Sequence, residues 1–468
     1  MILPREPSVR LAQRFAPAAL ALALLSLLSL LSACGSDGGS ARGAPVEMAE
    51  VANLPKAAID QSAAASGLQP LSGPARCNVS LRELVYRTQD PRASDLIVVS
   101  AALLVPEGAD CTGPFPLVAY SKATDVLRAR TLANAADPET QMLVAMFAAQ
   151  GYAVVAPDYI GFARSDYPYH PYLEAASEAA TNLDAIRAAR GALLPQGVRL
   201  QDDVFLAGYS QGGHVSMASQ RTIESIRPRD IRVAAAGHSS GPYDLGGTFL
   251  AGLSLLPAGS FGSTLFVPYI VTGYQKTYGN LYAVPSDYFK PPYDGWIESL
   301  VPGELSPDQL LASGRLPRLL GDLITPRLVS DLQTPGSGLR QALERNTLLG
   351  WTPQAPTLLC GGARDPVVDF RNTLQAQAAF QARGATVTTI DVEKLPAFAP
   401  QFPASLTPAQ LAAYHGGTVS PLCLQVVRDQ LFEPVRAARA NAAPAPDLLP
   451  VPPSPQAVGG FASVRVAR

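Results

Sequence analysis

Charged residues and histidines are scarce in this chain, and paired cysteines of the zinc-binding kind are missing. Of its 468 residues, 16% are charged and 4 are histidines, and the formal net charge is −2. A chain without a basic surplus lacks the electrostatic footprint of nucleic-acid-binding proteins, so no nucleic-acid partner is expected. No Cys-x-x-Cys pair occurs, which argues against a tetrahedral zinc site, and nothing in the sequence requires a metal or another cofactor. The hydrophobic content of 47% is ample for a folded core.

The first 34 residues have the pattern of a bacterial secretory signal. Three arginines precede an almost wholly apolar run at residues 16–31, and small residues then lead to Cys34. Residues 31–34 resemble a lipobox, in which Cys34 is lipidated and becomes the first residue of the mature chain. The alternative is an uncleaved membrane anchor, but the run is short for a spanning helix and no charged stop follows it. The residue after the cysteine is Gly35 and not Asp. By resemblance to Gram-negative lipoproteins, this disfavours retention at the inner membrane, so we expect a lipid anchor in the outer membrane or at the cell surface.

Segments of biased composition flank one large folded region. Residues 35–74 are rich in Ala, Gly, Ser and Pro, which predicts a flexible tether between the membrane and the folded body. Residues 437–468 are again rich in Pro and Ala and are predicted to form a C-terminal tail. The folded domain is therefore expected to span residues 75–436.

Four cysteines lie within this predicted domain, and export would place them in an oxidising compartment. Cys77, Cys111, Cys360 and Cys423 can form two disulfides in three ways. The sequence-local pairing joins Cys77 to Cys111 and Cys360 to Cys423, and each bond would close a loop of modest length. No cysteine lies in the sequence context of a nucleophile.

Strand-like apolar runs alternate with helical segments through most of the domain. This alternation predicts an α/β fold with a mostly parallel central sheet and helices on both faces. Residues 240–354 break the rhythm, because they contain no clear core strand and many Pro, Gly, Leu and Tyr residues. Their position between two predicted strands indicates an inserted helical lid over the C-terminal edge of the sheet, where such sheets bind ligands. The predicted strands are residues 81–86, 96–104, 115–120, 152–156, 204–209, 231–237 and 357–360.

The motif Gly208-Tyr209-Ser210-Gln211-Gly212 follows a predicted strand and opens a predicted helix. Serine is a weak nucleophile that needs an adjacent base. A sharp turn between strand and helix lifts the serine Oγ clear of the sheet edge, and small residues on either side prevent clashes. The motif in this context is typical of the nucleophile elbow of α/β-hydrolases, with Ser210 as the nucleophile. The alternative is an ordinary turn between a strand and a helix.

The general base can be identified by elimination, because the catalytic residues of this fold follow in the order Ser, acid, His. His170 precedes the serine, and His214 lies on the helix that the serine opens. His238 ends the next predicted strand, too early to follow an acid from a later one. His415, beside two glycines, is therefore the predicted base.

The acid should follow a strand between the serine and the base. Asp365 lies in the loop after the predicted strand at 357–360, where it can orient the His415 ring and stabilise the imidazolium. Asp369 is the nearby competitor, and Asp391 is the third candidate.

An oxyanion hole needs two backbone N–H groups. The first is expected from Gln211, directly after the nucleophile. The second is expected from the loop after the strand at 115–120, and the candidates there are Ala123 and Thr124. Many hydrolases have His-Gly in this loop, whereas this chain has Lys122-Ala123, so the sequence leaves the second donor open between the two residues.

Two further groups of residues are interpreted as structural. Asp158 follows the predicted strand at 152–156, in a loop where a buried carboxylate more often holds the backbone than reacts. Tyrosines between residues 269 and 288 could line an apolar channel, but they are more typical of a lid core. They are Tyr269, Tyr274, Tyr278, Tyr282 and Tyr288.

Four segments together resemble the secretory lipase family of α/β-hydrolases: residues 157–166, 208–213, 361–368 and 415–418. The likeness runs from about residue 77 to about residue 430. It implies the fold and the Ser–Asp–His order, but it does not separate lipases from esterases.

We therefore expect a serine hydrolase that cleaves lipid or other apolar esters through an acyl-enzyme. A serine peptidase on the same fold is one alternative, although no propeller and no acidic amine-binding pair is evident. A surface lipoprotein that binds a lipid or a partner without catalysis is the other, and the complete ordered set of Ser210, Asp365 and His415 argues against it. Acyl-chain preference and oligomeric state are not predicted.

Overall fold

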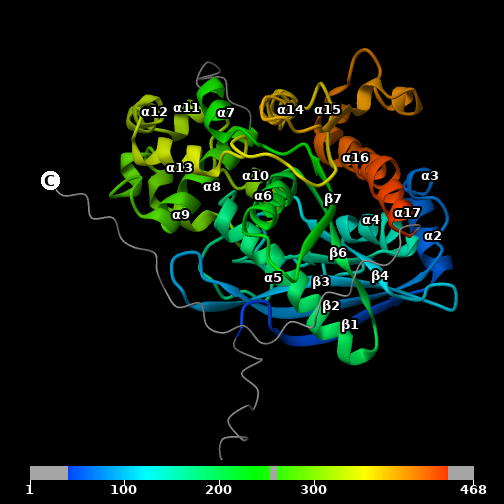
Figure 1. Cartoon of the computed structure of the whole chain (residues 1–468). Helices are drawn as coiled ribbons and strands as arrows, with labels where there is room; N and C mark the ends of the chain where they lie inside the picture. The colour runs from blue at the N-terminus through cyan, green and yellow to red at the C-terminus, as the bar shows by residue number, and fades with distance from the viewer. Residues whose placement is uncertain (1–40, 253–260, 441–468) are drawn as a thin grey trace, which may run out of the picture. The chain divides into compact units, whose positions relative to one another are not determined.

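The computed structural model describes residues 41–252 and 261–440, and nine strands in this part of the chain form one sheet (Figure 1). Predictions for residues 1–34, including Cys34, and for residues 35–40 and 441–468 lie outside the described residues. The strand order across the sheet is β1-β2-β3-β5-β4-β6-β7-β8-β9. The strands are β1 Pro45–Leu54, β2 Asn78–Gln89, β3 Leu96–Glu107, β4 Phe115–Ser121, β5 Ala153–Pro157, β6 Leu200–Tyr209, β7 Arg232–Ser239, β8 Thr357–Gly361 and β9 Thr388–Asp391.

The sheet has an antiparallel side and a parallel side. The pairs β1–β2, β2–β3 and β3–β5 are antiparallel. All pairings from β5 through β4, β6, β7 and β8 to β9 are parallel. The predicted mostly parallel sheet is thus confirmed, and the carboxyl ends of β6, β7 and β8 meet at one edge.

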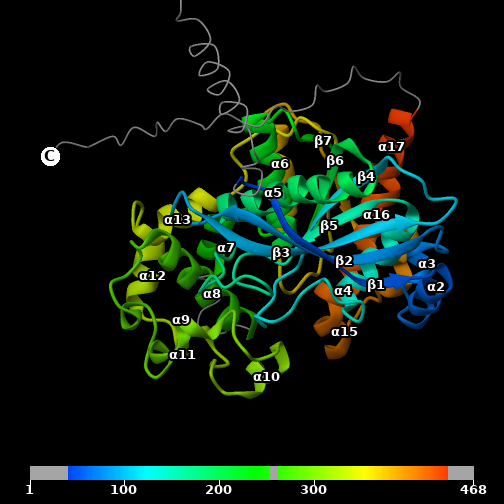
Figure 2. The ribbon, with the colours of Figure 1, turned by 90° about the horizontal axis from the view of Figure 1, so that it is seen from below.

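Helices cover both faces of the sheet, as predicted. In Figure 2, α5 (Ala175–Leu193) lies above the strands and α4 (Pro138–Met146) lies below them. β4 is buried along its whole length. Its Leu117 belongs to the core beneath α5, and its neighbour Val118 belongs to the core on the opposite face, with α4. Because successive strand residues point to opposite faces, a strand covered on both sides has a continuous apolar run. This run made β4 recognisable in the sequence.

The remaining helices have the following bounds: α2 Lys56–Ala65, α3 Gln69–Ser72, α6 Gln211–Ile226, α7 Leu245–Gly252, α8 Phe261–Tyr278, α9 Ile297–Leu300, α10 Pro307–Ala312, α11 Leu320–Leu323, α12 Pro326–Gln333, α13 Gly338–Asn346, α14 Arg371–Gln381, α15 Pro408–Ala413, α16 Ser420–Val427 and α17 Glu433–Ala440.

The tether predicted for residues 35–74 is wrong from residue 45 onward. Strand β1 pairs along its length with β2, and helices α2 and α3 follow it. Most β1 side chains are exposed, so the strand has little of the apolar pattern by which strands are recognised. Helix α2 buries only Ile59 and Ala63. At the other end, α17 continues to Ala440, past the predicted start of the tail at residue 437.

The segment between β7 and β8 contains helices α7 to α13, and its apolar side chains form a hydrophobic core together with Val126, Tyr172 and Leu173. Four of the five tyrosines singled out from the sequence are buried in that core, and Tyr278 packs against it. These rings fill the interior of the insertion, in agreement with their structural interpretation. The buried four are Tyr269, Tyr274, Tyr282 and Tyr288.

Two disulfides are present, Cys77–Cys111 and Cys360–Cys423. They are the sequence-local pairs among the three arrangements possible. Within residues 41–252 and 261–440, no helix is both long and apolar enough to cross a membrane. The same residues contain no cluster of His, Cys, Asp and Glu that could hold a metal ion.

Candidate active site

Ser210 lies at a strained turn between β6 and α6. Its backbone has φ 59° and ψ −120°, a conformation that non-glycine residues rarely adopt and that is found at functional sites. The flanking glycines permit the turn. A Cβ on Gly212 would lie 1.8 Å from the Ser121 carbonyl oxygen, and one on Gly208 would lie 2.0 Å from the Gly212 carbonyl oxygen. Both positions therefore require glycine because backbone approaches them closely.

The structure brings together the three residues predicted to be catalytic. His415 Nε2 lies 2.8 Å from Ser210 Oγ, and His415 Nδ1 lies 2.7 Å from Asp365 Oδ2. Asp365 Oδ1 accepts N–H groups from Val367 (2.9 Å) and Val368 (3.1 Å). The carboxylate is thus fixed by its own loop and presents its other oxygen to the imidazole.

The two competing carboxylates lie elsewhere. Asp369 pairs with Arg371 at 2.7 Å, and its side chain is 51% exposed. Asp391 accepts the N–H groups of Ala363 (3.2 Å) and Glu393 (3.1 Å), so it supports the loop that carries Asp365.

The other three histidines are buried and hydrogen-bonded away from the serine hydroxyl. His170 Nδ1 lies 2.9 Å from the Ile160 carbonyl oxygen, and His214 Nε2 lies 2.9 Å from the Asn346 carbonyl oxygen. His238 lies between Ser216 Oγ and Gln220 Oε1. Burial lowers the pKa of both His170 and His238 to about 3, so both rings remain neutral in the physiological range.

Tyr209 supports the histidine, a role that the sequence did not reveal. His415 lies in a π-helical turn, Tyr414–Val419, a geometry that often marks functional sites. The Tyr209 hydroxyl donates to the backbone carbonyl oxygen of His415 and lies 3.3 Å from Nδ1 of the His415 imidazole. Burial raises the pKa of Tyr209, and the Asp365 carboxylate adds to this increase, so the phenol remains a hydrogen-bond donor.

A second support joins the acid loop to the histidine loop. Glu393 accepts hydrogen bonds from Arg364 N (2.8 Å) and Arg364 Nε (2.6 Å), and also from the Tyr414 hydroxyl. Arg364 directly precedes Asp365, and Tyr414 directly precedes His415. The Cys360–Cys423 disulfide makes a covalent link between the same regions, because β8 leads to Asp365 and α16 follows the His415 turn.

The candidate oxyanion donors have different surroundings. Gln211 is the first residue of α6, and an α-helix provides no internal partner for its first N–H groups. The Ala123 N–H donates to Glu139 Oε1 at 2.9 Å. Ala123 is therefore already paired, which contradicts its predicted role. Thr124 remains the predicted second donor, and its Oγ1 lies 2.7 Å from the Tyr172 hydroxyl.

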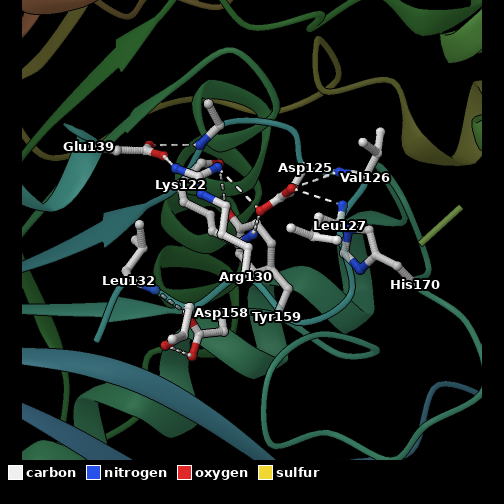
Figure 3. A network of polar contacts seen from close by, with 12 residues as sticks. Lys122, Asp125, Val126, Leu127, Arg130, Leu132, Glu139, Asp158, Tyr159 and His170 are labelled. Carbon is white, nitrogen blue, oxygen red and sulfur yellow. Dashed lines mark hydrogen bonds and ion pairs between the residues drawn. The ribbon is translucent and has the colours of Figure 1, made fainter. Parts of the chain in front are cut away.

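A network of buried and half-buried charges holds the loop that carries Ala123 and Thr124, as Figure 3 shows. Lys122 Nζ and Arg130 Nη1 each lie 3.2 Å from Asp125 Oδ2. Arg130 also pairs with Glu139 at 3.0 Å. Burial alone would raise the pKa of Asp125, but Lys122 and Arg130 outweigh it and hold that pKa below its usual value. Lys122, which replaces the expected histidine of this loop, thus serves as a buried counter-ion.

The same loop contacts the insertion between β7 and β8. Arg128 donates to the carbonyl oxygens of Gly161 (3.0 Å) and Pro302 (3.2 Å), and a backbone bridge pairs Leu127 with Gly303. Tyr269 of α8 donates to the Asp125 carbonyl oxygen at 3.2 Å. The insertion therefore packs on the loop predicted to carry the second oxyanion donor.

Asp158 has the structural role predicted for it. It is fully buried and accepts hydrogen bonds from Ser100 Oγ (2.6 Å), Thr131 Oγ1 (3.0 Å) and Leu132 N (2.8 Å). These hydrogen bonds join β3 to the segment before α4. None of them involves Ser210 or His415.

The mixed sheet with a strained serine between β6 and α6 defines an α/β-hydrolase. The chain belongs to the secretory lipase family of these enzymes. Residues 127–254 match the family model described as secretory lipase. The esterase LipA from Xanthomonas oryzae is 35% identical, with a TM-score of 0.75, and the match covers 85% of this chain and 100% of that one. No curated protein sequence matches the chain.

Two more distant structures share the fold. A protein from Legionella pneumophila is 22% identical with a TM-score of 0.71, and the match covers 86% of this chain and 100% of that one. Candida antarctica lipase A is 18% identical with a TM-score of 0.55, over 76% of this chain and 77% of that one. The secretory lipase family and the similar Xanthomonas oryzae esterase support hydrolysis of carboxylic esters as the activity of this chain.

Proposed function

We propose that the chain is a serine esterase or lipase that works through an acyl-enzyme, with Ser210, His415 and Asp365 as its catalytic residues. The observation that carries the proposal is the unbroken series of contacts from Ser210 Oγ through the His415 ring to Asp365, at 2.8 and 2.7 Å. Serine needs an adjacent base to act as a nucleophile, and a carboxylate on Nδ1 holds the imidazole in the tautomer that can accept a proton at Nε2.

In the first half-reaction, Ser210 Oγ attacks the ester carbonyl while His415 Nε2 takes the hydroxyl proton. The tetrahedral intermediate collapses, the bond to the alcohol breaks, and His415 returns the proton to the leaving alcohol. Water then attacks the acyl-enzyme by the same route and releases the acid and the free serine. The N–H of Gln211 and that of Thr124 stabilise the oxyanion in both steps.

The proposed substrate is an apolar ester, either a lipid or a small acyl ester. The test uses the purified mature protein and p-nitrophenyl esters from acetate to palmitate. It also includes an acetylated polysaccharide, because the Xanthomonas oryzae relative is described as a rice cell wall degrading esterase. We expect turnover of at least one ester class and labelling of Ser210 by a fluorophosphonate.

Two outcomes of this test would contradict the proposal. Faster cleavage of aminoacyl amides than of the matched esters would indicate a peptidase on the same fold. Absence of both turnover and fluorophosphonate labelling in folded protein would indicate a binding protein without catalysis.

We also propose that Cys34 is lipidated and anchors the enzyme to the outer membrane or the cell surface. The basis is the signal and lipobox pattern at residues 1–34 together with the secretory family. Cys34→Ser is expected to move the protein from the membrane fraction to the soluble fraction, measured by fractionation of a Gram-negative host and by loss of palmitate incorporation. Wild-type protein that stays in the membrane fraction without incorporating palmitate would instead support an uncleaved anchor.

A further inference from the structure

The side chain of Gln211 is held beneath the nucleophile turn by two buried acceptors. Its Nε2 donates to Glu178 Oε1 at 2.6 Å and lies 2.7 Å from His170 Nε2. His170 Nδ1 faces the Ile160 carbonyl oxygen at 2.9 Å, so Nδ1 carries the ring proton and Nε2 accepts. Both amide hydrogens of Gln211 are thus used, and Gln211, Glu178 and His170 are each at most 2% exposed.

Glu178 is itself fixed from several sides. Its Oε1 also accepts the Leu173 N–H at 3.1 Å. Its Oε2 lies 3.6 Å from His214 Nδ1 on α6, and neither atom has a hydrogen-bond partner within the described part of the chain. Burial raises the pKa of Glu178, although contacts with His214 and Gln211 oppose this. The Glu178 carboxyl group on α5 therefore faces two buried residues of the first turn of α6, Gln211 and His214.

We infer that Glu178 is a positioning residue for the oxyanion hole: it fixes Gln211, and through Gln211 it aims the backbone N–H that follows Ser210. This inference rests on the proposed function. A buried amide that loses an acceptor must turn to find another or remain unpaired, which is unfavourable in a buried site. Because Gln211 is the first residue after the strained serine, a turn of its side chain displaces the N–H on which oxyanion stabilisation depends.

The decisive variant is Glu178→Leu, compared with Glu174→Leu as a matched control. Glu174 lies one turn earlier, at the start of α5, and is also buried. It accepts hydrogen bonds from Ser177 and Tyr278, and none of its hydrogen bonds within the described residues reaches the nucleophile turn. We expect Glu178→Leu to lower kcat by about 100-fold, the usual effect of losing one oxyanion donor, with KM within threefold of wild type. Glu174→Leu should lower the melting temperature by a similar amount but leave kcat within threefold.

Two further variants keep the test sharp if Glu178→Leu folds poorly. Glu178→Gln retains an acceptor for Gln211 and should recover kcat to within tenfold of wild type. Gln211→Leu removes the other partner of the hydrogen bond between Gln211 and Glu178. If both residues act through this one bond, kcat of the double variant Glu178→Leu/Gln211→Leu should be no lower than that of the slower single variant.

Fluorophosphonate labelling supplies an independent measure, because phosphonylation of serine also develops negative charge on oxygen. The labelling rate should fall in parallel with kcat in Glu178→Leu and remain unchanged in Glu174→Leu. The inference is overturned if both variants lower kcat equally, or if Glu178→Leu alters only KM or the melting temperature. Failure of the proposed function is distinguishable, because wild-type protein would then show neither turnover nor labelling.

Discussion

Replacing Ser210 by Ala is expected to lower kcat for ester hydrolysis by about 10⁴-fold or more, equivalent to about 5.5 kcal/mol of transition-state stabilisation. In the wild-type protein, His415 Nε2 lies 2.8 Å from Ser210 Oγ. The variant keeps the backbone turn but has no hydroxyl for His415 to activate. Any residual rate would come from binding and the oxyanion donors. Hydrolysis of p-nitrophenyl butyrate measures the loss, and the melting temperature should change by no more than a few degrees.

Ser219→Ala is the matched control for this experiment. Ser219 lies on the same helix, α6, is fully buried, and donates to the Val215 carbonyl oxygen at 2.8 Å. Its replacement should leave kcat within a fewfold of wild type and should preserve fluorophosphonate labelling. If Ser210→Ala retained a tenth of wild-type activity, the nucleophile would have to be another group.

Replacing Asp365 by Asn is expected to lower kcat by about 10⁴-fold, because an amide NH₂ in place of Oδ2 would face His415 Nδ1. The ring would then carry its proton on Nε2, the nitrogen 2.8 Å from Ser210 Oγ. An imidazole protonated on that side cannot accept the serine proton. The loss of kcat comes from the changed tautomer of the His415 imidazole, and the rest of the site stays intact. KM should therefore change little. Measurement of kcat and KM over a pH series checks this.

Asp369→Asn provides a matched comparison from the same loop. Asp369 pairs with Arg371 at the surface, and exposed ion pairs contribute about 0–1 kcal/mol. Activity and stability should therefore remain close to wild type. A larger loss in Asp369→Asn than in Asp365→Asn would reassign the acid to the competitor that the sequence left open.

The sequence was most informative where burial and chemistry coincide. Strands β4 and β6 are covered on both faces, so their apolar runs predict them, and the glycines around Ser210 are required by close backbone contacts. The short list of histidines made elimination possible. Strand β1 was not predicted, because its side chains are largely exposed and it is held in the sheet by backbone pairing with β2.

The residues that support the site could not be predicted, because their roles depend on contacts between distant segments. Glu393 follows β9, and it contacts Arg364 and Tyr414 in a fold where β9 pairs with β8. The Ala123 N–H was an acceptable oxyanion donor by position, but Glu139 of α4 takes that hydrogen bond once the fold forms. No periodicity or short motif encodes such partners.

The Cys360–Cys423 bond has a consequence for where the enzyme can mature. It joins β8, the strand that leads to Asp365, to α16, the helix that follows the His415 turn. The segments that carry Asp365 and His415 therefore share a covalent link that a reducing cytoplasm does not sustain. A chain retained before export would have the same sequence but not this bond. This link between the two loops of the candidate site would then form only in an oxidising compartment.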